Sequence, residues 1–231
     1  MRSNDINSIQ AGIMRQLFFN DGLRFAEINV DDVPSDQFSY HLKQLLKYDL
    51  LEKSPDNTYR LSVMGRTRAI MLYPAKDSFI EQGFLAVRIV LSKVEDETQY
   101  FLLQERAAVP FKGTYGTPGD KILFGEDVEQ AAIRAMQLQT GLLCDVTLCG
   151  IKHIKDNYRG KVVQDKYFFV FRASNPQGVL LARGRTGKNM WLSYDQVHSS
   201  GRSTNGGLEL LEMAGTQRLQ FDEQTFAIDS Y

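Results

Sequence analysis

The sequence predicts an α+β protein of two domains, in which helices and a β-hairpin precede a larger domain of strands and helices. Three observations support this prediction. The chain of 231 residues is long for one domain. Apolar residues recur at helical spacing in its first third, and long apolar runs typical of strands follow. A Pro and a Gly in the segment 73–84 indicate the break, so we expect domains 1–75 and 76–231.

Composition and charge exclude several classes of protein. Apolar residues at 43% and charged residues at 24% are ordinary for a globular chain, and 27 basic against 28 acidic residues leave it almost neutral. The first twenty residues lack a secretory signal, and no apolar stretch is long enough to span a bilayer. We therefore expect a cytoplasmic protein with no membrane partner. Cys144 and Cys149 are expected to be buried thiols rather than a disulfide.

The first domain is expected to hold three helices and a hairpin. A first helix follows from the spacing of Ile6, Ile9, Ile13 and Leu17, and a second short helix is expected over Arg24 to Ile28. A third begins at Pro34-Ser35-Asp36, with an apolar stripe of Phe38, Leu42, Leu45 and Leu46. The segment 50–65, LLEKSPDNTYRLSVMG, predicts two short strands around a Pro-Asp-Asn turn.

These elements resemble the winged helix-turn-helix of transcriptional regulators of the ArsR and MarR kind. The resemblance implies that the third helix enters the major groove of DNA while the hairpin touches the backbone or minor groove. The DNA contacts would then be Gln37, Tyr40, Lys43, Gln44, Lys47, Lys53, Asn57 and Arg60, with His41 as a further candidate. Residues 36–68 carry only a small basic excess, so a dimerisation or protein-docking role stays open.

The second domain reads as a mixed arrangement of strands and helices. Two strands, LAVRIVLSKV and QYFLLQER, flank Glu95-Asp96-Glu97. The glycine-rich stretch 113–126 then leads to a helix of amphipathic spacing that Gly141 closes. Further strand-like runs follow, CDVTLCGIKHI and DKYFFVFRA, and NMWLSYDQV is expected to run from a strand into a short helix. The order predicts an α+β sandwich.

The loop and helix from Asp120 to Leu142 resemble the Nudix signature without gaps. Glu126 stands six residues after Asp120, Arg134 eight after Glu126, and Gly141-Leu142 close the pattern. The resemblance, which extends over most of the second domain, implies a Nudix-type α/β/α sandwich with a mixed sheet. Because Asp120 replaces the first glycine of the signature, the loop is expected to survive through the tolerance of Asp for unusual dihedral angles.

The three metal-binding glutamates of the signature fall at Ala135, Leu138 and Gln139. Three carboxylates on one helix face bind the divalent cations that neutralise a diphosphate and activate water. Here that face would carry a methyl, an isobutyl and an amide group, so we expect a pseudoenzyme with no metal ligands and no catalytic residues. Ala135 and Leu138 are expected to extend the core or line a dry pocket, while Glu126 and Arg134 brace the loop.

A winged helix joined to a degenerate Nudix domain is similar to the Nudix-related transcriptional regulators, which usually place the Nudix domain first. The order found here resembles bacterial proteins with an N-terminal winged helix before a Nudix domain, many of which keep the glutamates. The resemblance to the regulators implies a DNA-binding regulator whose catalytically inactive second domain senses a nucleotide or nucleotide-sugar, or holds a homodimer, without a cofactor. Basic side chains suit phosphate and aromatic ones suit a base. The candidate ligand contacts are Arg106, Tyr115, Lys121, Glu126, Arg134, Lys166 and Phe168.

Two alternative functions stay open. One is a Nudix hydrolase of a nucleoside diphosphate derivative, with Mg²⁺ or Mn²⁺ held by displaced ligands drawn from Asp120, Glu126, Asp127, Asp156 or Asp165. The other is a scaffold whose two domains serve as docking surfaces for a protein partner.

Overall fold

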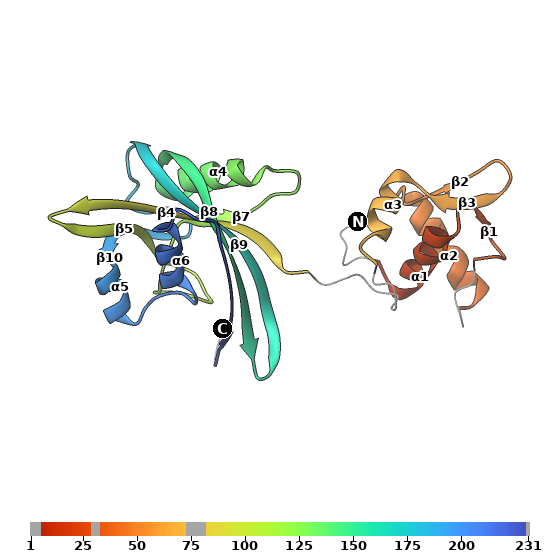
Figure 1. The fold of residues 1–231 in the computed structure, drawn as a ribbon. Helices are drawn as coiled ribbons and strands as arrows, with labels where there is room; N and C mark the ends of the chain where they lie inside the picture. The colour runs from red at the N-terminus through yellow and green to blue at the C-terminus, as the bar shows by residue number, and fades with distance from the viewer. Residues whose placement is uncertain (1–5, 29–32, 73–81, 230–231) are drawn as a thin grey trace. The chain divides into compact units, whose positions relative to one another are not determined.

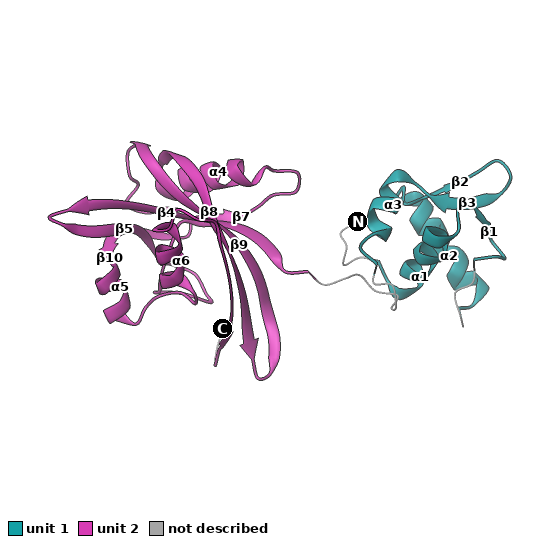
Figure 2. Ribbon diagram, viewed as in Figure 1, with its two compact units in different colours: residues 1–81 teal, residues 82–231 magenta. Residues whose placement is uncertain are grey.

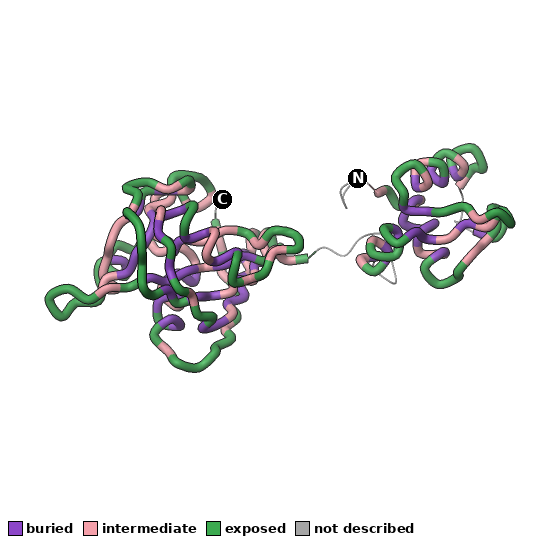
Figure 3. Tube along the Cα trace, turned by 90° about the horizontal axis from the view of Figure 1, so that it is seen from above, coloured by how far each residue is buried: buried purple, intermediate pink, exposed green. Residues whose placement is uncertain are grey.

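The computed structural model describes residues 6–28, 33–72 and 82–229, which belong to two compact units, residues 1–81 and 82–231 (Figures 1 and 2). Buried residues gather inside each unit (Figure 3), so each has a hydrophobic core of its own. The boundary expected after Ala75 lies outside the described residues.

The first unit is a small α/β region built on three helices and a three-stranded antiparallel sheet. The helices are α1 (Ser8–Phe19), α2 (Ser35–Lys47) and α3 (Val63–Ala69). The strands are β1 (Leu23–Arg24), β2 (Leu51–Lys53) and β3 (Thr58–Leu61), in the order β1-β3-β2. The predicted first and third helices and the hairpin are confirmed. Helix α3 was not predicted from the sequence. It is capped by Ser62, whose side chain accepts a hydrogen bond from the Gly65 N–H.

Two predictions for the first unit are wrong. The segment Arg24 to Ile28 is no helix: Leu23 and Arg24 pair with β3, and a turn follows in which the Ile28 N–H bonds to the Arg24 carbonyl. Pairing with β3 satisfies backbone groups that a helix would otherwise have used. His41 does not face outward, because it is buried and its ring contacts the Asn7 side chain at 3.3 Å.

The second unit is organised around one large curled mixed sheet. Its strands are β4 (Phe84–Glu95), β5 (Thr98–Arg106), β6 (Tyr115–Gly116), β7 (Gly119–Lys121), β8 (Leu142–Tyr158), β9 (Lys161–Gly178), β10 (Gly187–Ser193) and β11 (Gln220–Ala227). The strand order is β10-β5-β4-β9-β8-β11, with β6 beside β5 and β7 beside β4. Pairs β4–β9 and β8–β11 are parallel, and the other pairs are antiparallel.

Helices cover both faces of this sheet. Alternate residues of β4 point to opposite faces: Val87 and Ile89 pack with α4 (Val128–Thr140), whereas Ala86 and Val90 pack with α6 (Gly207–Ala214). A third helix, α5 (Tyr194–Ser200), adds Val197 to the α6 side. The predicted strand-to-helix run at 189–197 and the helix closed by Gly141 are confirmed, whereas α6 and β11 were not predicted.

The two cysteines are buried free thiols, as predicted. Cys144 belongs to the core on the α4 side and Cys149 to the core on the α6 side, so their side chains lie on opposite faces of the sheet. Burial raises the pKa of both thiols, which keeps them protonated and poorly nucleophilic.

Candidate functional site

The loop before α4 is braced by one arginine. Arg134 Nε donates to Glu126 Oε1 at 2.6 Å, and Arg134 Nη1 donates to Asp120 Oδ2 at 2.9 Å. Glu126 also accepts from the Leu123 N–H, and these hydrogen bonds hold its pKa below the ordinary value. The bracing role expected of Glu126 and Arg134 is thereby confirmed.

The close approach beside Asp120 depends on its neighbour Gly119. A Cβ at Gly119 would lie 2.3 Å from the Val87 carbonyl oxygen, so only glycine fits there. Asp120 itself does not adopt a positive φ, so its backbone does not need the conformational freedom of glycine. The loop therefore keeps its path although Asp120 replaces the glycine of the signature.

The face of α4 that should carry the metal-binding glutamates has no acidic residue at the three signature positions. Ala135 and Gln139 are fully buried, at 0% exposure, whereas Leu138 is 50% exposed. The expectation that Leu138 extends the core or lines a pocket is wrong, because position 138 of α4 turns outward. A methyl, an exposed isobutyl and a buried amide do not fit a divalent cation, which needs oxygen ligands, preferably carboxylates.

Gln139 belongs to a buried network of amides. Its carbonyl oxygen accepts from Asn189 Nδ2 at 2.9 Å and its Oε1 from Thr186 Oγ1 at 2.8 Å. Gln104 Nε2 in turn donates to Asn189 Oδ1 at 2.9 Å. Strand β10 and the residues just before it thus close over the end of α4 with neutral hydrogen bonds.

Four of the five acids proposed as displaced metal ligands are engaged elsewhere, and the fifth, Asp127, is exposed at the N-cap of α4. Asp120 and Glu126 pair with Arg134, Asp156 pairs with Lys166, and Asp165 Oδ1 lies 2.7 Å from His153 Nε2. Within the described residues, no group of three or more His, Cys, Asp or Glu side chains is arranged to hold a metal ion.

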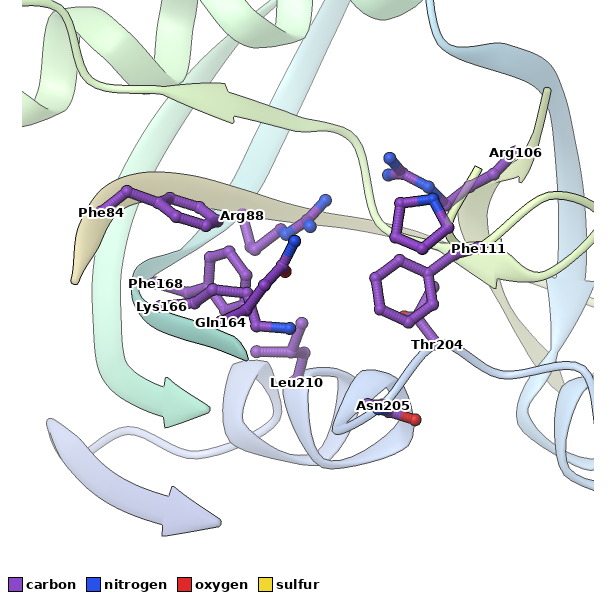
Figure 4. Close-up of a pocket in the computed structure, with 11 residues that line it drawn as sticks. Phe84, Arg88, Arg106, Phe111, Gln164, Lys166, Phe168, Thr204, Asn205 and Leu210 are labelled. Atoms are coloured by element: carbon purple, nitrogen blue, oxygen red, sulfur yellow. The ribbon is translucent and has the colours of Figure 1, made fainter. Parts of the chain in front are cut away.

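A cavity of about 160 Å³ lies on the opposite, α6 side of the sheet (Figure 4). Strands β4 and β9, the end of β5, the loop after it and the approach to α6 all contribute to its wall. Three of its eleven described lining residues are basic and none is acidic. The lining residues are Phe84, Arg88, Arg106, Pro110, Phe111, Gln164, Lys166, Phe168, Thr204, Asn205 and Leu210.

The three basic groups of this pocket have few anionic partners. Burial, with the charge of Arg106 as a second cause, lowers the pKa of Arg88 to about 10. Burial also lowers the pKa of Arg106, whose Nε is buried without a hydrogen-bond partner among the described residues. Lys166 pairs with the buried Asp156. Among the described residues, the carboxylates that act on these cations are Asp156 and Asp120, and Asp120 also pairs with Arg134. The excess of positive charge favours an anionic ligand.

Aromatic rings lie beside these cations. The guanidinium of Arg88 sits 4.6 Å from the centroid of the Phe168 ring, and Phe168 contacts Phe84 edge to face with centroids 6.4 Å apart. The ring of Phe111 lies 5.3 Å from Lys166 Nζ. The pocket therefore combines positive charge with flat apolar surfaces, an arrangement that suits a phosphorylated ligand bearing a ring.

The structure brings together some of the predicted ligand contacts and separates others. Arg106, Lys166 and Phe168 share the pocket. Lys121 lies beside the pocket, with Nζ 5.4 Å from the centroid of the Phe84 ring. The hydroxyl of Tyr115 instead accepts a hydrogen bond from Arg202 at 2.8 Å. Glu126 and Arg134 pair with each other in the loop before α4.

Sequence reasoning missed several pocket residues, Arg88 and Phe111 above all. Arg88 carried a signal, because it is the lone charge inside the apolar run LAVRIVL and so had to find a polar environment in a buried strand. Phe111, Thr204 and Asn205 come from loops whose paths the sequence does not reveal.

The eight residues proposed to contact DNA lie on α2 and on the β2–β3 hairpin. Six of them are exposed and Gln44 and Arg60 are half-buried. Asn57 occupies the hairpin turn with φ of 66°, a conformation that Asn tolerates well. Gln37, Tyr40, Lys43, Gln44 and Lys47 follow one another at helical spacing along α2, so that they form one polar face.

The fold and the loop–helix frame define a Nudix protein. The NUDIX domain model matches residues 84–212, and the chain belongs to this family. It is 27% identical over 107 residues to an ADP-ribose pyrophosphatase of Methanocaldococcus jannaschii, a match that covers 46% of this chain and 63% of the relative. The chain thus spans less than two thirds of that relative's length.

A solved structure supports the fold. A MutT protein of Bacillus halodurans matches with a TM-score of 0.52 and 23% identity, over 63% of this chain and 90% of that one. The Nudix domain of Shewanella oneidensis NrtR, solved with ADP ribose, matches with a TM-score of 0.46 and 20% identity, over 59% and 88%. Among the described residues, no helix is long and apolar enough to cross a bilayer.

Proposed function

We propose that this protein is a DNA-binding regulator whose Nudix domain binds a nucleoside diphosphate derivative without hydrolysing it. The observation that carries the proposal is the contrast inside the second unit. The helix that holds metal in the signature carries Ala135, Leu138 and Gln139, whereas the opposite face holds a pocket with three basic groups. Fixed cations take over the neutralisation of phosphate charge that bound metal would otherwise provide.

The ligand is a phosphate ester with an attached ring. Arg88 and Arg106 offer hydrogen-bond donors to phosphate oxygens, and Phe84, Phe111 and Phe168 offer surfaces to a ring. The cavity is smaller than the roughly 300–1,000 Å³ of sites that enclose a whole drug-sized ligand, so it encloses one end of a dinucleotide-sized compound. ADP-ribose, the substrate named for the archaeal relative, is the first probe.

The first unit supplies the DNA-binding part of the proposal as a winged helix-turn-helix. Helix α2 would lie in the major groove with its exposed polar face, and the β2–β3 hairpin would touch the backbone. A ligand alters DNA affinity only if it binds the two states of the protein with different affinities. The proposal therefore requires that ligand and DNA binding be coupled in solution.

Fluorescence anisotropy at graded salt tests this part. The full-length protein is titrated against DNA selected from a random-sequence pool, with and without ADP-ribose. Replacing Lys43 and Lys47 by Ala should weaken binding and lower the slope of log affinity against log salt by about 0.9 for each lost phosphate contact. Arg66→Ala, which removes an exposed charge on α3, is the matched control and should leave the slope unchanged.

Three results would contradict the proposal. They are absence of DNA binding at low salt, an equal loss of DNA affinity in the control variant, and a DNA affinity that does not change when ADP-ribose is added. A metal-dependent hydrolase remains the competing function, since the archaeal relative is named a pyrophosphatase. It would show release of product from ADP-ribose in Mg²⁺ or Mn²⁺.

A further inference from the structure

Lys166 is the most enclosed basic group of the pocket. Its side chain, on β9, is 5% exposed, and Nζ pairs with the fully buried Asp156 of β8. The ring of Phe111, another wall of the pocket, lies 5.3 Å from the same nitrogen. The amine is thus held at a fixed place in the cavity wall, shielded from bulk water.

The surroundings of Lys166 favour its neutral form more than those of a surface lysine do. Burial lowers its pKa, and the charges of Arg88 and Arg106 lower it further, against the opposing effect of Asp156. A neutral lysine is a nucleophile, and desolvation together with neighbouring cations is the usual way in which proteins activate one. Asp156 stands beside it as a proton acceptor, itself held by Asn205 Nδ2 at 3.2 Å.

We propose that Lys166 forms a reversible imine with a phosphate ester that carries an aldehyde. Lys166 passes a proton to Asp156, and the nitrogen lone pair forms a bond to the carbonyl carbon. The carbonyl oxygen takes up the proton, and loss of water from the carbinolamine then leaves the C=N bond. Amine and aldehyde give imine and water, so no oxidant or reductant is needed. The proposal rests on the pocket being a ligand site.

The aldehyde must be anionic because of the other groups in the pocket. Arg88 and Arg106 attract a phosphate, and Phe84, Phe111 and Phe168 cover the carbon skeleton. A small phosphorylated aldehyde also suits a cavity of about 160 Å³ better than a full dinucleotide does. The class includes sugar phosphates whose open-chain form exposes the carbonyl.

Pyridoxal 5′-phosphate is a suitable probe, since it combines a ring, a phosphate and an aldehyde. The full-length protein is incubated with it, the imine is fixed with borohydride, and labelled lysines are mapped by mass spectrometry. Lys166 should be labelled faster than the more exposed Lys121, since a lowered pKa raises the fraction of neutral amine at neutral pH. Inorganic pyrophosphate should protect Lys166, and pyridoxal without phosphate should label it more slowly.

Two variants separate the explanations. Lys166→Arg keeps the charge but cannot form the imine, so the label should be lost, whereas Lys121→Arg should retain it. Labelling that follows lysine exposure, or that pyrophosphate does not reduce, would overturn the proposal. The wild-type map alone decides this, even if the Lys166 variant fails to fold. Thermal stabilisation by ADP-ribose without labelling of Lys166 would refute the imine while leaving the proposed function intact.

Discussion

The two faces of the sheet in the second unit differ in how far their charged groups are paired. On the α4 face, Arg134 is saturated by Glu126 and Asp120, and Gln139 lies in a network of neutral amides. On the α6 face, the charges of Asp156 and Asp120 offset three basic groups only in part, and Arg106 Nε lacks a partner among the described residues. On the α4 face the charged groups are paired, and the neutral Gln139 Nε2 is buried without a hydrogen-bond partner among the described residues. On the α6 face positive charge is in excess, which favours binding of an anion.

This difference shows how a family frame can persist where the residues at its metal-binding positions are replaced. Arg134, Glu126 and Gly141 keep the loop and helix in place through an ion pair and a left-handed C-cap with φ of 77°. None of these roles needs a metal. The signature therefore contains a structural part, which this chain retains, and a metal-binding part, which it lacks.

The sharpest way to test the closed face is to return one carboxylate to it. Gln139→Glu replaces a buried amide by an acid beside Thr186 and Asn189 without changing its size. An uncompensated buried charge should lower the free energy of unfolding by about 3 kcal/mol at neutral pH. The loss should shrink as the pH falls, because the buried acid then becomes protonated. Urea unfolding at several pH values measures this.

Leu138→Glu is the matched control, since it introduces the same charge on the same helix at a half-exposed position. Its effect should stay within about 0.5 kcal/mol. Equal destabilisation by the two variants would show that the face is not closed in the way described.

The pocket face is tested by removing one cation. Arg106→Gln should weaken ADP-ribose binding by about tenfold to a hundredfold, the equivalent of one charged hydrogen bond. It should cost little stability, because Arg106 Nε has no partner to lose among the described residues. Lys121→Gln at the edge of the pocket should change affinity by less than about threefold. Isothermal titration calorimetry gives both values, and similar losses in the two variants would contradict a specific pocket.

The smallest expected effect concerns the loop brace. The Arg134 hydrogen bonds, and then that from the Leu123 N–H, lower the pKa of Glu126, so its stabilising effect is present above the unfolded-state pKa. It is lost as the pH falls through the lowered folded-state pKa. Glu126→Gln should therefore cost about 1 kcal/mol at neutral pH and nothing in acid. Thermal unfolding across pH checks this, with Glu97→Gln as a control of unchanged profile.

Much of the fold could be predicted from the sequence because local signals agreed with it. Three local signals predicted elements that the structure contains. They are the helix stop at Gly141, the helical spacing of Ala131, Ala132, Ala135 and Met136, and the turn at Glu95-Asp96-Glu97. The helix predicted for residues 24–28 was wrong because the start of this segment pairs with β3, whose residues lie more than thirty positions away in the sequence.

The candidate site was harder to predict. Arg106, Lys166 and Phe168 could be chosen by residue type, but their shared pocket depends on pairing between β4 and β9, which places Phe84 opposite Lys166 and Ala86 opposite Phe168. The outward turn of Leu138 likewise follows from how α4 docks on the sheet. Long-range register and helix rotation are not encoded in a short motif.

Calorimetry of ADP-ribose binding to the full-length protein tests the central claim most directly. The titration is run once in EDTA and once in Mg²⁺, and the recovered ligand is checked by chromatography. Fixed cations in the pocket predict the same Kd in both buffers and intact ligand after incubation. Binding that requires Mg²⁺, or conversion of ADP-ribose to products, would contradict it.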